Sequence, residues 1–235
     1  MSATPRPFSN VLDRSNSGEA VAKALSLAIH EHRLAPGTKL GEDDLAEIYG
    51  VSRTVVRAAL QSLAHLQLVD MRRHRGAFVA QPSLGEAQEV FEARELLEPR
   101  TARMAARSST SSNIKSLQGH IVEEHAALAA DDPGRALNLS GLFHIEIARI
   151  AGQATIAGFI ETLVARSSLI IALYWRRESA LCEKHAHHAL VQAIAEGQEQ
   201  LAEELMRSHL VDIHSALDLR ERPAAARSLK EALMR

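Results

Sequence analysis

The stretch from Leu40 to Val79 constrains the fold more than any other part of the chain, because two short helical patterns and a paired-strand pattern follow one another in it. The first helix has an apolar side formed by Leu45, Ala46 and Ile48. Gly50 is expected to end this helix, since a residue without Cβ readily adopts positive φ at a helix C-terminus. Ser52 is a favourable N-cap for a second helix, so the turn between the helices is about three residues long.

The second helix presents different side chains on its two faces. The inward face is apolar and consists of residues that recur at helical spacing: Val56, Leu60, Leu63 and Leu66. Arg53, Thr54 and Arg57 lie on the opposite face, in the first turns of the helix. Guanidinium and hydroxyl groups at an exposed helix end can hydrogen-bond to bases and phosphates in a DNA groove. The pattern predicts a helix-turn-helix whose second helix contacts double-stranded DNA.

A basic β-hairpin is predicted after Leu68. Apolar residues alternate on both sides of a Gly-containing turn, namely Val69 and Met71 before it and Phe78 and Val79 after it. The tip carries Arg72, Arg73 and Arg75. Residues 51–80 contain five Arg and one acidic residue, in a chain with a net charge of -2. This local positive charge is suited to phosphate, so we expect a winged helix-turn-helix domain.

The same stretch resembles a known family. The runs PGTKL, LAEIYGVSRTVVRAAL and RGAFVA are similar to the N-terminal domain of the GntR family of bacterial transcription regulators, over about a third of the chain. The resemblance implies recognition-helix contacts to DNA from Ser52, Arg53, Thr54 and Arg57. It implies wing contacts from Arg73, His74 and Gly76.

The chain departs from the family pattern at four positions. Val55 replaces a common Pro, Ala58 replaces a common acid, and Gln67 replaces a Gly that often ends the helix. Asp43 stands at a position that is basic in some relatives. One accessory phosphate contact is therefore not carried over, whereas the pair of recognition arginines is unaffected.

Composition favours a soluble, mainly helical protein of two domains. The chain has 235 residues, with only 3% aromatic residues and an abundance of Ala and Leu. Its single cysteine, Cys182, excludes an intrachain disulfide and fits a reducing cytoplasm. The N-terminus lacks the apolar core of a signal peptide, and no apolar run of about 18 residues indicates a membrane span.

Turn signals predict the domain organisation. Residues 1–16 are expected to be a flexible N-terminus, 17–81 the DNA-binding domain, 82–222 an all-helical domain that binds an effector and dimerises, and 223–235 a tail that could be helical. A supporting helix is expected over 18–34. In the second domain, helices are expected near 84–107, 112–130, 133–151, 154–177, 178–196 and 198–219. Short joints predict an antiparallel bundle with a central cavity.

Three of the eight histidines in the helical domain are expected to face its interior. His187 precedes Gly197 by ten residues and His209 follows it by twelve. At about 1.5 Å per residue, both imidazoles lie roughly 15–18 Å from the turn, at one level of an antiparallel pair. His144 continues the apolar stripe of the helix near 133–151. Three inward imidazoles favour a metal site. The alternative is that each is a hydrogen-bonded core histidine.

The helical domain also resembles a known group. The segments EVFEARELLEPRTARMAA, LFHIEIARIAGQ and HALVQAIAEGQEQLAEELMRSHL are similar to the effector domain of the FadR subfamily, the all-helical FCD type. Many members hold a divalent metal through one Asp and three His. The resemblance implies a metal such as Zn, Ni or Mn on His144, His187 and His209, with Ser140 at the usual Asp position. A hydroxyl is a weak ligand, so a less tight, neutral site is expected.

Two further groups of the helical domain are candidates for the cavity. The resemblance places Arg94 there, where a guanidinium could hold an effector carboxylate bidentately. Its alternative is an intrahelical pair with Glu98 in solvent. Tyr174 and Trp175 line the pocket or pack between helices, and packing is the favoured reading.

These features favour one function over two others. We expect a homodimeric regulator, a repressor, that binds a palindromic operator under the control of a small carboxylate. The alternative is a metal-dependent hydrolase or isomerase that uses the three histidines, although no carboxylate beside them is an evident general base. A non-specific DNA packager is excluded by the net charge of -2.

Overall fold

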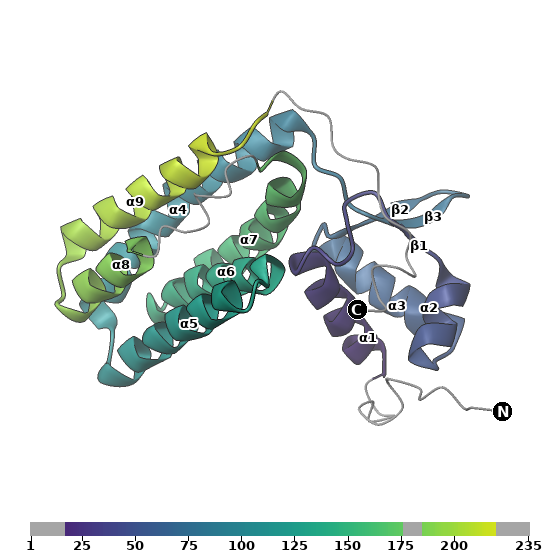
Figure 1. Ribbon diagram of the computed structural model, residues 1–235, viewed down its shortest axis with the longest axis horizontal. Helices are drawn as coiled ribbons and strands as arrows, with labels where there is room; N and C mark the ends of the chain where they lie inside the picture. The colour runs from purple at the N-terminus through teal and green to yellow at the C-terminus, as the bar shows by residue number, and fades with distance from the viewer. Residues whose placement is uncertain (1–16, 176–184, 220–235) are drawn as a thin grey trace. The chain divides into compact units, whose positions relative to one another are not determined.

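The computed structural model describes residues 17–175 and 185–219, which form two compact units. One unit comprises residues 17–29 and 33–80, and the other comprises 30–32, 81–175 and 185–219 (Figure 1). The expected mainly α fold, with an N-terminal winged helix-turn-helix and a C-terminal helical bundle, is confirmed.

The first unit contains three helices and a small sheet. Its elements are α1 (Ser17–His30), β1 (Lys39–Leu40), α2 (Glu42–Tyr49), α3 (Arg53–His65), β2 (Val69–Arg72) and β3 (Gly76–Val79). The strands are antiparallel in the order β1-β3-β2. The core of the unit consists of fully buried apolar residues on all three helices, among them Val21, Leu25, Leu45, Val56 and Leu60. Burial of these faces positions α3 with its polar face outward.

The turn between α2 and α3 has the expected chemistry. Gly50 caps α2 in the left-handed conformation, with φ 65°. Ser52 caps α3, and its hydroxyl oxygen accepts a hydrogen bond from the Val55 backbone N–H at 3.3 Å. The turn is thus three residues, Gly50 to Ser52.

Four details of the first unit differ from the expectations. α1 ends at His30 rather than near Leu34. β1 was not expected, because a strand of two residues is too short to show alternation. α3 ends at His65, so Leu66 leaves the apolar face and is 40% exposed, while Leu68 is buried in its place. Gln67 has φ 56°, so it adopts the conformation that glycine favours without being glycine.

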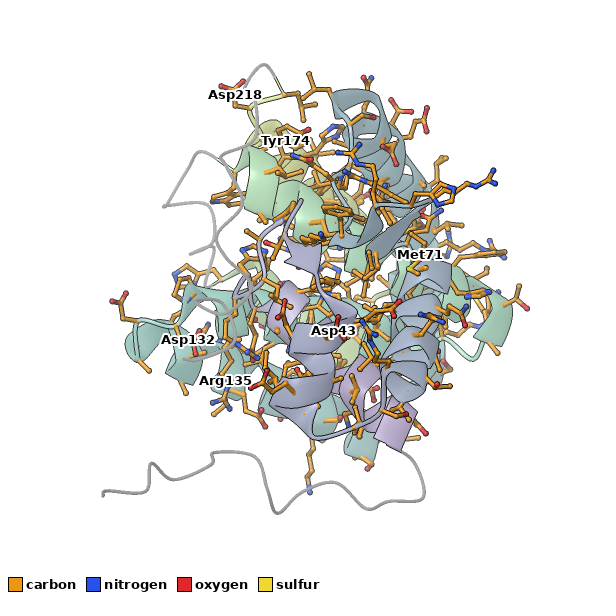
Figure 2. The ribbon with its side chains drawn as sticks, turned by 90° about the vertical axis from the view of Figure 1, so that its right-hand side faces the viewer. Asp43, Met71, Asp132, Arg135, Tyr174 and Asp218 are labelled. Carbon is orange, nitrogen blue, oxygen red and sulfur yellow. The ribbon has the colours of Figure 1, made fainter. Side chains whose placement is uncertain are left out.

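The second unit is a bundle of helices. Within the described residues they are α4 (Leu84–Ser108), α5 (Ser111–Ala129), α6 (Pro133–Ile150), α7 (Ala154–Tyr174), α8 (Ala186–Ala195) and α9 (Glu199–Ser215). α8 and α9 lie beside α4, and α6 lies between α5 and α7 (Figure 1). The starts of α4, α5 and α6 carry side-chain caps. Asp132 accepts a hydrogen bond from the Arg135 backbone N–H at 3.0 Å (Figure 2), and Ser83 forms a capping box with Glu86.

Apolar side chains from α4, α5, α6, α8 and α9 form the main core of the bundle, including Ala105, Ile121, Phe143, Ile194 and Met206. Gly197, with φ 67°, turns the chain between α8 and α9. Two helix ends differ from the expectations. α7 ends at Tyr174 because Trp175 is extended, and α9 ends at Ser215 rather than 219. Some expected features lie outside the described residues: the N-terminal residues 1–16, residues 178–184 of the helix expected near 178–196, Cys182, and the tail after 219.

α7 is long and apolar enough to cross a membrane by length and composition, with a window of mean hydropathy 1.7. The expectation that no such segment exists is therefore wrong. Half of this window is buried inside the bundle. Arg166 on α7 is itself buried and forms an ion pair with Glu86 on α4. Both features are typical of a core helix.

Candidate functional site

The polar face of α3 carries the residues predicted to contact DNA. Ser52, Arg53, Thr54 and Arg57 are all exposed, while Val56 on the opposite face is fully buried. The amphipathic pattern of the helix thus orients three donor side chains and a capping hydroxyl toward the same side as solvent. These exposed side chains could hydrogen-bond to bases and phosphates if α3 entered a DNA groove.

Arg53 and Arg57, the two arginines of α3 that are predicted to contact DNA, are paired with acids at the start of α2. Arg57 donates from Nε and a terminal nitrogen to the two carboxylate oxygens of Glu42, at 3.1 and 2.7 Å. This hydrogen bonding lowers the pKa of Glu42. Arg53 makes a single contact, from a terminal nitrogen to one carboxylate oxygen of Asp43, whose place on α2 is labelled in Figure 2. Asp43, at a position that is basic in some relatives, therefore pairs directly with an arginine that is predicted to contact DNA.

The wing separates its arginines into two kinds. Arg72 lies in β2, with its guanidinium carbon 4.5 Å from the centre of the Phe78 ring and a 3.4 Å ion pair to Asp70. Arg73, His74 and Arg75 form the exposed tip, where His74 has φ 58° and Gly76 has φ 92°. Within the described residues, Arg73 and Arg75 have no ion-pair partner. Of the three wing arginines expected to face phosphate, Arg73 and Arg75 carry charges without an ion pair in the described residues, whereas Arg72 is paired with Asp70.

In the bundle, His144, His187 and His209 converge through their Nε2 atoms. The Nε2 atom of His209 lies 3.1 Å from that of His187 and 3.3 Å from that of His144. His144 and His187 are buried, and one ligand atom of each of the three rings lies within 4.8 Å of the others. α6, α8 and α9 each contribute one imidazole to this three-histidine cluster.

The spacing of the cluster fits a metal ion. Zn–N bonds of about 2.0–2.1 Å at tetrahedral angles separate ligand nitrogens by roughly 3.3–3.4 Å, and octahedral angles by roughly 3.0 Å. Two of the three separations, 3.1 and 3.3 Å, agree with these values, and all three nitrogens lie within 4.8 Å of one another. The three imidazoles are therefore close enough to share one divalent ion.

Two buried glutamates hold the far sides of the imidazoles. The Nδ1 atom of His144 lies 2.6 Å from a Glu98 oxygen, and that of His187 lies 2.9 Å from a Glu124 oxygen. A carboxylate that accepts the Nδ1 proton leaves the Nε2 lone pair directed at the centre of the cluster. The sequence suggested no carboxylate beside the histidines as an evident general base, and the two carboxylates that do lie there contact the Nδ1 atoms. Both carboxylates bind the far nitrogens, as in outer-shell partners of metal ligands.

Arg94 holds Glu98 in place. Its Nε atom donates to Glu98 at 2.6 Å, and a terminal nitrogen donates to the Ser167 hydroxyl at 3.0 Å. The intrahelical pair considered from the sequence is present, but it is buried rather than in solvent, with Arg94 only 3% exposed. Arg94 does not line the pocket beside the histidines. Its contacts make it a positioning residue for the Glu98–His144 pair.

The electrostatics of the cluster favour neutral imidazoles at His144 and His209. Burial lowers the pKa of His144, and the opposing effect of Glu98 does not compensate. Burial, followed by the proximity of the other two histidines, lowers the pKa of His209 well below its ordinary value. Burial alone would raise the pKa of Glu98, but Arg94 and His144 lower it to about 2. A neutral imidazole is the form that binds metal.

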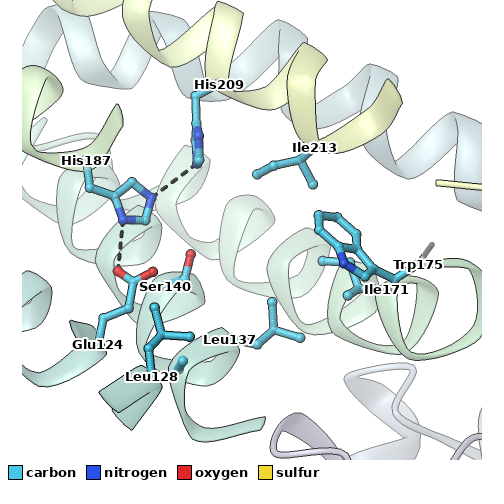
Figure 3. A pocket seen from close by; sticks show the side chains of 10 residues that line it. Glu124, Leu128, Leu137, Ser140, Ile171, Trp175, His187, His209 and Ile213 are labelled. Carbon is cyan, nitrogen blue, oxygen red and sulfur yellow. Dashed lines mark hydrogen bonds and ion pairs between the residues drawn. The ribbon is translucent and has the colours of Figure 1, made fainter. Parts of the chain in front are cut away.

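A pocket opens beside the cluster (Figure 3). Its polar end is formed by His187, His209, Glu124 and Ser140. Ser140 lies one helical turn before His144, where the resemblance implies an Asp. Its hydroxyl has no hydrogen bond within the described part of the chain. The rest of the pocket is largely apolar and is lined by Leu128, Ala136, Leu137, Ile171, Ile213 and Trp175.

Sequence reasoning missed Glu124 and the role of Glu98. Glu124 follows Leu117 and Ile121 on the buried stripe of α5, at helical spacing. Glu98 is buried on the stripe of α4 that also contains Phe91 and Ala102. An acid on an apolar stripe was the available signal, because a buried carboxylate requires a partner.

Comparison with known proteins identifies both units. Residues 17–79 match the gntR family of bacterial regulatory proteins, and residues 89–212, more than half of the chain, match the FCD domain. The chain is 25% identical to the HTH-type transcriptional regulator LutR of Bacillus subtilis, over 80% of this chain and 95% of LutR. It is 27% identical to the HTH-type transcriptional repressor RspR of Escherichia coli, over 85% of this chain and 78% of RspR.

A solved structure has the same fold. A protein from Rhodococcus sp. RHA1, described as a GntR transcriptional regulator, superposes with a TM-score of 0.72 at 22% identity, over 84% of this chain and 95% of that chain. The relatives are regulators, so the hydrolase or isomerase alternative is not favoured. The chain belongs to the GntR family of bacterial regulators and combines its DNA-binding domain with an FCD domain, as a transcription regulator and not an enzyme.

Proposed function

We propose that the protein is a cytoplasmic, homodimeric repressor whose operator affinity is controlled by a small carboxylate, bound beside a divalent ion on His144, His187 and His209. The observation that carries the proposal is the convergence of three Nε2 atoms, with separations of 3.1 and 3.3 Å, beside a pocket. The winged helix-turn-helix in the same chain is the part that binds the operator.

The operator contacts come from the first turns of α3 and from the wing. Arg53, Thr54 and Arg57 contact bases and phosphates, with Ser52 at the helix start, because they share the exposed face. Arg73, His74, Arg75 and Gly76 contact phosphate at the wing tip, where charge is exposed, and Arg72 supports them through Phe78. One recognition helix reads only a few base pairs, so two copies on a palindrome supply the affinity.

Dimerisation is supported by exposed apolar side chains on two helices that pack together. Leu96 on α4 is 76% exposed and Phe159 on α7 is 60% exposed. Large apolar side chains at such exposure are suited to a protein interface.

The three histidines hold the ion, and their surroundings decide what else binds. Zn, Ni or Mn are the candidates, since neutral imidazole suits these ions. A bound ion would supply positive charge and open coordination positions. Glu98 and Glu124 fix the imidazole orientations through Nδ1, and Ser140 leaves the adjacent position without a carboxylate.

The charge around the cluster explains why an anionic effector depends on the ion. One arginine, Arg94, stands against two glutamates, Glu98 and Glu124, for a formal charge of -1. The empty cluster therefore disfavours a carboxylate. A divalent ion reverses the sign, and the carboxylate then completes the coordination that Ser140 does not provide.

Operator binding measured with and without metal tests the proposal. A duplex is first selected from a random library with the purified protein, and its affinity is measured by fluorescence anisotropy. We expect short carboxylates to change this affinity in metal-loaded protein, and to have no effect after the metal has been removed with a chelator. The proposal is overturned if no duplex is selected, or if carboxylates act equally after chelation.

A further inference from the structure

The end of the pocket opposite the histidines contains a hydrogen-bond donor. Trp175 lines the pocket with Ile171 and Ile213, and its indole group faces this apolar end (Figure 3). The indole nitrogen, Nε1, is buried and has no hydrogen-bond partner within the described part of the chain. A buried indole N–H is usually paired in folded proteins, so this donor, on a residue that lines the pocket, lacks the partner that such a group normally has.

The backbone holds Trp175 in position from two sides. Its N–H donates to the Ile171 carbonyl at 3.0 Å, which ends α7, and Trp175 forms a β-bridge with Leu217. The adjacent Asp218 N–H donates to the Tyr174 carbonyl at 2.7 Å. The segment after α9 and the end of α7 therefore fix one another. The indole is positioned by the fold rather than by its own packing alone.

The histidine end of the pocket and the end that contains the Trp175 indole are separated by at least one helical turn. His209 and Ile213 lie on the same face of α9, about 6 Å apart along the helix axis. Ile213 belongs to the same apolar group as Trp175. The walls between the ends are Leu128, Leu137 and Ile171, which offer no polar group. A molecule that spans the pocket therefore needs an apolar middle.

We propose that Trp175 is a specificity-determining residue, whose indole N–H donates a hydrogen bond to an oxygen at the far end of the effector. This inference rests on the proposed function, in which the near end is a carboxylate at the histidine cluster. The ligand class is a short-chain acid with a second oxygen acceptor, a hydroxyl or a carbonyl, several carbon atoms from the carboxylate. Plain fatty acids lack the acceptor and leave the indole unpaired.

The test uses pairs of acids that differ by one hydroxyl. Butyrate is compared with 4-hydroxybutyrate, and caproate with 6-hydroxycaproate, by titration calorimetry on the full-length, metal-loaded protein. We expect the preferred hydroxy acid to bind about tenfold more tightly than its partner, the effect of one hydrogen bond. In Trp175→Phe, which keeps an aromatic ring without the N–H, this difference should disappear while the affinity for the plain acid is largely kept.

Fluorescence supplies a second readout in the wild-type protein, because Trp175 is the only tryptophan of the chain. The hydroxy acid should change the indole emission more than the plain acid does. This comparison tests the role of the Trp175 indole in the wild-type protein, so it does not require Trp175→Phe to fold. Equal binding and equal emission changes within both pairs, or discrimination that persists in Trp175→Phe, overturn the inference alone. Failure of every acid to bind overturns the proposed function together with it.

Discussion

His187 and His209 lie 22 residues apart in the sequence, and their Nε2 atoms lie 3.1 Å apart in the structure. The turn at Gly197 makes this possible, because α8 and α9 run antiparallel from it. His144 on α6 completes the cluster at 3.3 Å from His209. This cluster is the proposed metal-dependent effector site, and it lies in a different unit from the proposed DNA-binding face.

Arg57→Ala should weaken specific operator binding by about 1–3 kcal/mol, because it removes a guanidinium fork from the exposed start of α3. Fluorescence anisotropy on the selected duplex measures this loss. Arg100→Ala is the matched control, since Arg100 is an exposed arginine on α4 in the other unit. Unchanged affinity in a folded Arg57→Ala protein would remove Arg57 from the recognition surface.

Asp43→Asn should strengthen binding to DNA by roughly two- to fivefold, since exposed ion pairs contribute about 0.2–1 kcal/mol. Asp43 competes with DNA for Arg53, and both side chains are largely exposed, at 71% and 62%. Asp44→Asn is the control, because it removes the same charge from the next residue, for which no ion pair is present in the described residues. Equal gains in the two variants would mean that only overall charge matters and that the Arg53 pair has no specific effect.

Much of the DNA-binding unit could be predicted from sequence because its signals are local. Gly50 ends α2 and Ser52 caps α3, and each does so through its own backbone or side chain. The buried residues of α3 likewise follow its apolar spacing. β1 could not be predicted, since two residues carry no period. Leu66 was misplaced because it continues the apolar spacing, although α3 ends at His65 and Leu66 is its C-cap, directly before Gln67 adopts positive φ.

The candidate site was predictable only in part, for a related reason. Positions along a helix place His187 and His209 at one level, which spacing alone reveals. The partners Glu98 and Glu124 come from other helices, and the sequence does not specify which carboxylate meets which imidazole. The buried position of Arg94 likewise depends on Ser167, 73 residues away.

Gln67→Gly should stabilise the protein by about 0.5–1 kcal/mol, because a left-handed conformation is strained for a residue with Cβ and not for glycine. Urea denaturation, followed by circular dichroism, measures the free energy of unfolding. Gln61→Gly is the control within α3, where helical geometry makes glycine unfavourable, and a loss of similar size is expected there. A loss of stability in Gln67→Gly would show that the side chain outweighs the strain.

Ser140→Asp should raise metal affinity and weaken the carboxylate effector. The new carboxylate lies one turn before His144 on the same face of α6, so it can add a hard anionic ligand and compete for the position that an effector carboxylate would take. Titration calorimetry with Zn, Ni and Mn, and then with the short acids, measures both effects. Ser140→Asn has a similar shape without the charge and should show neither. A Ser140→Asp protein with wild-type metal affinity would place Ser140 outside the coordination sphere.

The metal content of the purified protein tests the central claim most directly. Mass spectrometry of the metal is compared for wild type, His187→Ala and His188→Ala after equal dialysis against the same divalent ion. His188 is the matched control, because it follows His187 on α8 and is exposed. We predict about one ion per chain in wild type and His188→Ala, and a large loss in His187→Ala. Equal content in all three proteins, or none in any, would mean that His144, His187 and His209 are packing residues and would contradict the account.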